Sequence, residues 1–246
     1  MTSALLGFSG FVGQTLLKQT QFNWKYNSKN IESIRGETFD TIVCAAAPAQ
    51  KWIANKNPEW YAVNRNGDNS LDYRAYVDYY QWLSPFHPEA REHIINNAKK
   101  IMEVNRIQSV HLDYVRYPDV ILGADLQPKY NIIQDKELAE YDYDYHPIAR
   151  EKFKEIFNKD PLDLKNPELS TEWRQFRLNA ISTLVNEIVE IANKKNVNVT
   201  AAVFPFPEMS RQMVRQAWND WNLFKAYPML YQNFYKILFC LNQILL

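Results

Sequence analysis

The sequence has few cysteines, few glycines and no excess of charge of either sign. Its 246 residues include 2 cysteines, 6 glycines, 28 lysines and arginines, and 28 aspartates and glutamates. Cys44 and Cys240 are far apart, so no disulfide framework or C-x-x-C metal site can be drawn, and both are expected to be free thiols. A neutral chain also lacks the basic footprint of a nucleic-acid-binding protein. We therefore expect a neutral or polar partner.

No long hydrophobic run or signal-like segment interrupts the sequence. The start has no basic n-region and reaches Gly7 before an apolar h-region develops, which predicts no signal peptide and, by default, a cytoplasmic protein. The apolar tail at residues 236–246 is too short for a membrane span of about 20 residues, so we expect a packed or fraying terminal helix. No H-E-x-x-H zinc spacing and no G-x-S-x-G nucleophile elbow occurs. The sequence makes no prediction about oligomeric state.

Aromatic residues, in contrast, are abundant. They make up 14% of the chain, and many of the 15 tyrosines and 7 tryptophans stand among Asn, Asp and Arg instead of among aliphatic residues. Such mixed surfaces suit sugars, whose C–H faces stack on aromatic rings while their hydroxyls take hydrogen bonds from polar neighbours. The alternative is ordinary core packing. The clustering of the rings favours a carbohydrate partner.

Residues 109–118, SVHLDYVRYP, are the most informative stretch. They form an alternating strand that ends on a carboxylate, an arginine and two tyrosines. In a parallel β/α barrel the reactive groups lie where strands end and loops begin, so Asp113 is the leading catalytic candidate. The structural alternative is that Asp113 caps the following loop and Arg116 pairs with it.

Residues 1–59 form a segment with a different pattern. A short apolar strand precedes a turn with Gly7, Gly10 and Gly13, a helix follows, and residues 39–47 predict a second buried strand. A G-x-x-G-x-x-G turn between strand and helix lets bare backbone approach a diphosphate, which would make these glycines cofactor-binding. The alternative is a tight glycine turn with no ligand.

This segment resembles the start of the extended short-chain dehydrogenase/reductase family, the nucleotide-sugar epimerases and dehydratases. The resemblance implies NAD(P) binding and an epimerase-like or dehydratase-like function as an alternative. The family's catalytic Tyr-x-x-x-Lys pair does not occur in the sequence, and Glu32, the candidate for the ribose-binding acid, stands in a polar stretch without strand character. We therefore expect no cofactor.

From Trp60 onward the pattern indicates alternating strands and helices, as in parallel α/β proteins. A polar insertion at residues 119–145 is too long for an ordinary strand–helix connection and is typical of a substrate-facing loop. The other expected elements are strands near Trp60 and at 109–112, 197–204 and 225–231, and helices from Pro88, at 147–157, at 172–194 and around Met213, Val214 and Ala217.

Four separated segments are similar, in order, to the glycosyl hydrolase-like 10 family: residues 64–67 (NRNG), 82–91 (WLSPFHPEAR), 111–118 (HLDYVRYP) and 227–231 (YPMLY). The resemblance covers about residues 60–235. The family is bacterial and often exported, and its proteins are regarded as (β/α)8 barrels that act on glycans or cell-wall sugars. The resemblance therefore implies a glycoside hydrolase, without naming its substrate.

The expected barrel is incomplete. A (β/α)8 barrel needs about 250 residues and eight strands, whereas residues 60–235 offer four strand candidates. We therefore expect an α/β chain with an incomplete (β/α)8 TIM-type barrel at 60–235. It would be fused to a truncated Rossmann-like segment at 1–59 and followed by the apolar tail. Truncation could impair activity, and a non-catalytic glycan-binding or non-functional fusion is a further alternative.

Hydrolysis of a glycosidic bond typically needs two carboxylic groups, and Asp113 and Glu208 are the best pair in the sequence. Arg116 and His111 would favour the charged form of Asp113, while the apolar residues 204–207 would desolvate Glu208 and suit it as the acid. Either residue could take either role. Glu208 could equally be a first-turn carboxylate that complements a helix dipole.

Polar and aromatic residues on the same rim are the expected substrate-binding groups. Arg65 and Asp68 could instead form a surface ion pair of little energetic value. In an extended conformation, the run at residues 140–146, EYDYDYH, would place Asp142, Asp144 and His146 on one side. Oxygen-rich sets of this kind can hold Ca²⁺. We nevertheless expect a solvated loop without metal. The substrate-binding candidates are Asn64, Arg65, Asp68, Trp82, His111, Tyr114, Arg116 and Tyr117.

Overall fold

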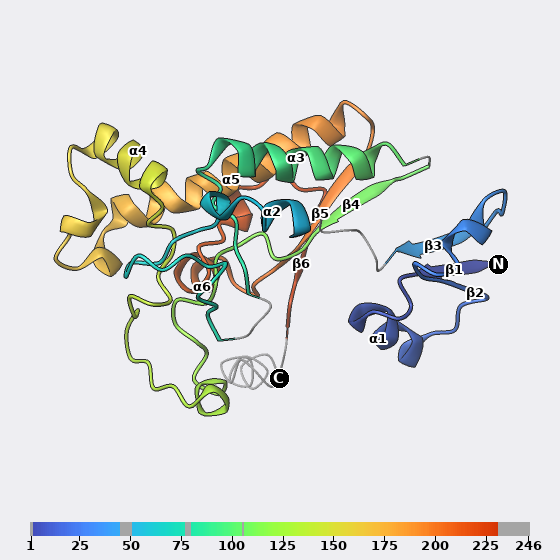
Figure 1. Cartoon of the computed structure of the whole chain (residues 1–246), viewed down its shortest axis with the longest axis horizontal. Coiled ribbons are helices and arrows are strands. Elements are labelled where there is room, and N and C mark those ends of the chain that lie inside the picture. Colours follow the sequence, from blue (N-terminus) through green and yellow to red (C-terminus); the bar gives the residue numbers. More distant parts are fainter. Residues whose placement is uncertain (1, 45–50, 77–79, 105, 231–246) are drawn as a thin grey trace, which may run out of the picture. The chain divides into compact units, whose positions relative to one another are not determined.

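The computed structural model describes residues 2–44, 51–76, 80–104 and 106–230 (Figure 1). The chain divides into two compact units, an N-terminal unit of residues 1–51 and a C-terminal unit of residues 52–246. The expectations for Cys240 and for the tail at residues 236–246 lie outside the described residues.

The N-terminal unit is a small parallel sheet. Its strand order is β2-β1-β3, with Ala4 and Leu5 of the central strand buried. The strand and the helix expected on either side of the glycine turn are confirmed, and the strand expected at residues 39–47 is described as far as Cys44. The elements are β1 (Ser3–Leu6), α1 (Phe11–Gln19), β2 (Trp24–Tyr26), the 3-10 helix η1 (Ile31–Ile34) and β3 (Thr41–Cys44).

The C-terminal unit contains a second parallel sheet, with the order β4-β5-β6. The strands expected at 109–112, 197–204 and 225–231 are confirmed, the last as far as Pro228. The α-helices and strands are α2 (Lys51–Ala54), α3 (Pro88–Met102), β4 (Ser109–Leu112), α4 (Pro147–Phe157), α5 (Thr171–Asn193), β5 (Asn198–Val203), α6 (Pro207–Met213) and β6 (Lys225–Pro228). The 3-10 helices are η2 (Pro58–Trp60), η3 (Gln127–Tyr130), η4 (Pro161–Asp163), η5 (Pro167–Leu169) and η6 (Trp218–Asp220).

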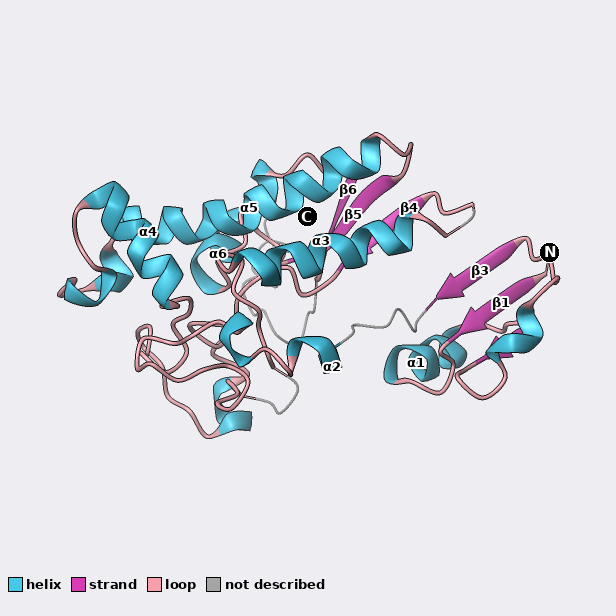
Figure 2. Ribbon diagram, turned by 45° about the horizontal axis from the view of Figure 1, so that its top comes forward, coloured by secondary structure: helices cyan, strands magenta, loops and turns pink. Residues whose placement is uncertain are grey.

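Helices α3 and α5 cover one face of this sheet (Figure 2), with α3 packed on β4 and α5 on β5. Helix α3 begins at Pro88, whose fixed φ suits a first helical position. Helix α5 begins after Ser170, whose hydroxyl accepts the backbone N–H of Trp173 at 3.2 Å. Because strand side chains alternate between faces, Val110 and Val199 are buried in the core cluster that includes Ile188 of α5.

The opposite face of the sheet carries polar and aromatic side chains. His111 is exposed, its Nδ1 lies 2.8 Å from the Thr200 hydroxyl, and its ring contacts that of Tyr227 with centroids 5.8 Å apart. In a closed (β/α)8 barrel this face would line the interior. Here the described residues form two three-stranded parallel sheets and no closed barrel, so the architecture is mixed α/β and consistent with an incomplete TIM-like fold.

One expected element of the C-terminal unit is wrong, and another ends earlier than expected. Residues near Trp60 form η2 and then isolated bridges, such as Tyr61 with Leu83, because the chain turns back on itself before a strand can extend. Helix α6 ends at Met213, so Val214 and Ala217 lie beyond it; Arg215, at a left-handed φ of 52°, turns the chain out of the helix.

The long insertion at residues 119–145 is confirmed as largely irregular, but it is not simply a substrate-facing loop. Its last residues are buried: Asp142, Tyr143 and Asp144 are each 0% exposed. Asn64 forms an isolated bridge with Tyr143. This end of the insertion is therefore part of the core. None of the helices that the structure describes combines the length and the apolar character needed to cross a lipid bilayer.

Candidate functional site

The site is built at the carboxyl edge of the second sheet. Strands β4, β5 and β6 are parallel, with Leu112 opposite Ala201 and Val203 opposite Pro228. Their carboxyl ends therefore face one edge, where ligands of parallel α/β proteins commonly bind. Asp113 follows β4 at this edge, and Phe204 follows β5.

Asp113 and Tyr114 form the turn that leaves β4. The Asp113 carboxylate is exposed and accepts a hydrogen bond from the Tyr114 backbone N–H at 2.8 Å. Tyr114 has a left-handed φ of 55°, a conformation that costs a non-glycine residue about 1–3 kcal/mol. Tyr114 is 48% exposed. Such strain at a strand end, beside an exposed carboxylate, is typical of functional sites.

An arginine surrounded by aromatic rings lies next to this turn. The central guanidinium carbon of Arg116 is 5.3 Å from the ring centroid of Trp82 and 5.5 Å from that of Tyr114. Tyr80 and Phe204 lie at 5.9 and 5.1 Å. Cation–π contacts of this kind are worth about 0.5–2 kcal/mol each, more when desolvated. These five residues are called the Arg116 cluster below, and the contacts within it help to hold the Tyr114 ring.

Arg116 is paired with Asp119, at 3.1 Å, and also donates to the Tyr117 carbonyl at 2.9 Å. Burial alone would lower the pKa of Arg116, but Asp119 and Tyr80 outweigh it and the pKa is raised. The part of the structural alternative that pairs Arg116 with Asp113 is therefore wrong, because the guanidinium of Arg116 pairs with Asp119 instead. The capping of the loop by Asp113, in contrast, is observed.

Glu208 is exposed in the first turn of α6. The expected desolvation of its carboxyl by residues 204–207 is not observed, because the helix starts at Pro207 and leaves the Glu208 side chain in solvent. This placement matches the alternative of a first-turn carboxylate complementing the helix dipole. It also leaves the Glu208 carboxylate accessible. Glu208 lies on the helix that follows β5, and β5 is the neighbour of β4, the strand that Asp113 follows.

The other substrate-binding candidates separate into rim and interior residues. His111 and Tyr114 are exposed, and Trp82 is 7% exposed within the Arg116 cluster. Tyr117 is 1% exposed and its hydroxyl lies 3.4 Å from the Asp144 carboxylate, so it is a core residue. Asn64 is also fully buried. The expected rim position of these last two residues is wrong.

Arg65 and Asp68 do not pair with each other. Arg65 lies 3.4 Å from Glu168, and Asp68 accepts a hydrogen bond from the Asn64 amide at 3.1 Å. The Asn64 amide oxygen accepts the backbone N–H groups of Asn66 and Asp68, at 3.0 and 2.8 Å. Asn64 therefore holds the shape of the loop from which Arg65 projects.

Two buried carboxylates of the insertion belong to the core, not to a solvated loop or a Ca²⁺ site. Asp142 contacts Arg177 at 2.5 Å and Arg215 at 3.6 Å, and Asp144 accepts the Ser84 hydroxyl. No group of three potential metal ligands occurs among the described residues. One feature of the sequence indicates this arrangement, because Arg177 is a charged residue on the otherwise apolar stripe of α5.

The glycine turn of the N-terminal unit is explained largely by packing. Gly7 has a left-handed φ of 79°, and a Cβ at Gly13 would lie 2.2 Å from the Gly7 carbonyl oxygen. A Cβ at Gly10 would meet that oxygen at 3.5 Å, an ordinary contact. Glu32, the candidate ribose ligand, lies exposed in η1 and pairs with Arg35 at 2.5 Å, away from any strand end.

Comparison with known proteins assigns the chain to a family. The family model of the glycosyl hydrolase-like 10 domain matches residues 35–237. No curated protein matches the chain. The match begins before the expected boundary near residue 60 and includes β3, and nothing in the comparisons supports the resemblance of residues 1–59 to short-chain dehydrogenases. Given a match over most of its length, together with an aromatic and acidic edge on a parallel sheet, the chain belongs to the glycosyl hydrolase-like 10 family.

Proposed function

We propose that this protein is a glycoside hydrolase that acts on a polysaccharide or cell-wall glycan. Membership of the glycosyl hydrolase-like 10 family suggests glycosidase activity and implies a carbohydrate substrate. The observation that carries the proposal is the Asp113–Tyr114 turn, which presents an accessible carboxylate beside a half-exposed ring at the carboxyl edge of β4.

In this proposal Tyr114 stacks on the C–H face of a sugar ring, and the Arg116 cluster keeps the tyrosine in place. Asp113 is the charged carboxylate that attacks the anomeric carbon or activates a water. Glu208 donates a proton to the leaving oxygen as the glycosidic bond breaks. If Asp113 attacks directly, a covalent glycosyl intermediate forms and water, deprotonated by Glu208, then releases the sugar with retained configuration.

The test is release of reducing ends by the full chain from a panel of polysaccharides and peptidoglycan. We expect turnover on at least one glycan, with loss in Asp113→Asn and in Glu208→Gln. Asp135→Asn, a change at another exposed acid of the same unit, is the matched control and should keep wild-type turnover. Glycan binding without turnover by the wild-type chain would contradict the proposal and indicate a binding protein.

A nucleotide-binding role of the N-terminal unit is the second candidate. It is favoured by the strand order β2-β1-β3, in which the neighbours of β1 lie on opposite sides and create a topological switch point beside the glycine turn. The test is quenching of tryptophan fluorescence by NADH or NADPH. Quenching that disappears in Gly10→Glu would support this role, and no quenching in the wild-type chain would contradict it.

A further inference from the structure

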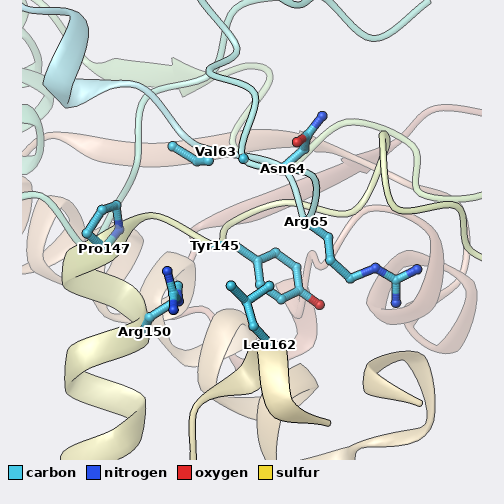
Figure 3. A pocket seen from close by; sticks show the side chains of 8 residues that line it. Val63, Asn64, Arg65, Tyr145, Pro147, Arg150 and Leu162 are labelled. Carbon is cyan, nitrogen blue, oxygen red and sulfur yellow. The ribbon is translucent and has the colours of Figure 1, made fainter. Parts of the chain in front are cut away.

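A small pocket of about 240 Å³ lies in the C-terminal unit, in a region that the proposed reaction does not use (Figure 3). In Figure 3, Arg65 and Arg150 appear on opposite sides of the Tyr145 ring, and Leu162 stands in front of that ring in this view. Tyr145 is 3% exposed and Leu162 is 44% exposed, so the pocket combines an accessible leucine with two arginines. Its lining residues are Val63, Asn64, Arg65, Gly67, Tyr145, Pro147, Arg150 and Leu162.

The wall of this pocket is rigidly built. The Arg65 backbone N–H donates to the carbonyls of Asp142 and Ala139, at 2.9 and 3.2 Å. Gly67 closes the turn with a left-handed φ of 94°, and its N–H donates to the Asn64 carbonyl at 3.0 Å. The Tyr145 hydroxyl donates to Asp142 at 2.8 Å, which fixes the ring. A site held this firmly loses little entropy when it binds a ligand.

The two arginines differ in how firmly they are held. Arg150 makes two hydrogen bonds to Asp160, at 3.0 and 2.6 Å. These bonds lower the pKa of Asp160 and keep the pair charged. Arg65 makes one long contact of 3.4 Å with Glu168, and the two side chains are 24% and 27% exposed. Arg65 can therefore exchange its carboxylate partner, because Glu168 can be solvated when it is released.

We propose that this pocket binds the carboxylate of an acidic sugar residue, a uronic-acid type of pyranose, with Arg65 as its partner. A pyranose ring lies against Leu162, which is 44% exposed, whereas Tyr145 is 3% exposed and only closes the inner end of the pocket. The carboxylate of the sugar replaces the single Glu168 contact with a bidentate pair to the Arg65 guanidinium. Bidentate arginine–carboxylate pairs are shorter and stronger than single contacts. The proposal rests on the proposed function only in taking the ligand to be a carbohydrate.

The test measures binding of methyl glucuronide, methyl glucoside and acetate to the full chain by calorimetry or NMR titration. We expect the glucuronide to bind about tenfold tighter than either of the other two, as one good charge-assisted contact supplies that factor. Arg65→Gln should remove this preference. Arg91→Gln is the matched control, because Arg91 is also 24% exposed and paired with a glutamate, Glu187, and it should keep the preference.

Glu168→Gln tests the exchange in the opposite direction. It removes the competing carboxylate and should tighten glucuronide binding several-fold, an effect that loss of folding cannot imitate. Equal binding of glucuronide and glucoside, or acetate binding as tight as the glucuronide, would overturn the proposal. A chain without glycosidase activity that still prefers the glucuronide would count only against the proposed function, because Asp113 and Glu208 are not needed for this binding.

Discussion

The guanidinium of Arg177 in α5 lies 2.5 Å from the carboxylate of Asp142, and both side chains are fully buried. Arg215 also approaches Asp142, at 3.6 Å. Burial alone would raise the pKa of Asp142, but Arg177 and Arg215 outweigh it and the pKa is lowered. The ionised carboxylate therefore joins the long insertion to α5.

Arg177→Met should lower the free energy of unfolding by about 3–5 kcal/mol, since it leaves a buried carboxylate with fewer cationic partners. Urea denaturation measures the change. The control is Arg211→Met, which breaks a more exposed pair with Asp220 and should cost at most about 1 kcal/mol. If the two variants lose the same small amount, the Asp142 network does not hold the insertion in place.

Asp144 should make the protein less stable as the pH rises. Burial raises the pKa of its carboxyl, and the hydrogen bond from Ser84 opposes this only in part. The native state therefore binds the proton more tightly than the unfolded state. The associated stability is present below the unfolded pKa of about 3.9 and is lost as the pH rises through the native pKa. Asp144→Asn, compared with wild type by urea denaturation from pH 3.5 to 7, should lack this loss.

Asp160 provides a control of opposite sign. Its hydrogen bonds to Arg150 lower the pKa of Asp160, so the stability it contributes is present above pH about 3.9 and is lost as the pH falls through its lowered pKa. Asp160→Asn should therefore be destabilised relative to wild type at neutral pH and approach wild type in acid. Relative to wild type, Asp144→Asn should gain stability as the pH rises and Asp160→Asn should lose it. If both variants changed in the same direction with pH, these assignments would be contradicted.

Gly13→Ala should destabilise the N-terminal unit by at least about 1–3 kcal/mol, because the added methyl group would meet the Gly7 carbonyl oxygen at 2.2 Å. Hydrogen exchange of the β1 backbone amides measures this change. Gly10→Ala, whose methyl group would make only a 3.5 Å contact, should cost less, about 0.5–1 kcal/mol, because alanine is a poorer N-cap of α1 than glycine. Equal protection of β1 in both variants would show that the turn does not need glycine for packing.

Much of the fold could be predicted from local pattern. The apolar stripe of α5, the proline start of α3 and the apolar alternation of β4 each depend on neighbours in sequence, and these elements were predicted correctly. The prediction of a strand near Trp60 was wrong. The partners of these residues, such as Leu83, depend on turns that the spacing of apolar residues does not reveal. The burial of the carboxylates at residues 142 and 144 was not predicted, because a charged side chain indicates solvent exposure unless its partners are known. These partners are Arg177 for Asp142 and Ser84 for Asp144.

The candidate site could be predicted only in part, because several of its contacts join residues that are distant in sequence. The position of Asp113 at a strand end follows from strand alternation. The partner of Arg116 does not, since Asp119 and Asp113 are both three residues from it in sequence. The burial of Tyr117 and Asn64 depends on residues 140–144, a contact distant in sequence.

The most direct test of the account separates the roles of Asp113 and Tyr114 by steady-state kinetics on a hydrolysed glycan. Asp113→Asn should lower kcat at least about a hundredfold with KM nearly unchanged, since the carboxylate acts on the reacting bond. Tyr114→Asn, which tolerates the left-handed backbone, should raise KM about tenfold with kcat nearly unchanged, since the ring only binds sugar. Wild-type kcat in Asp113→Asn would contradict the central claim.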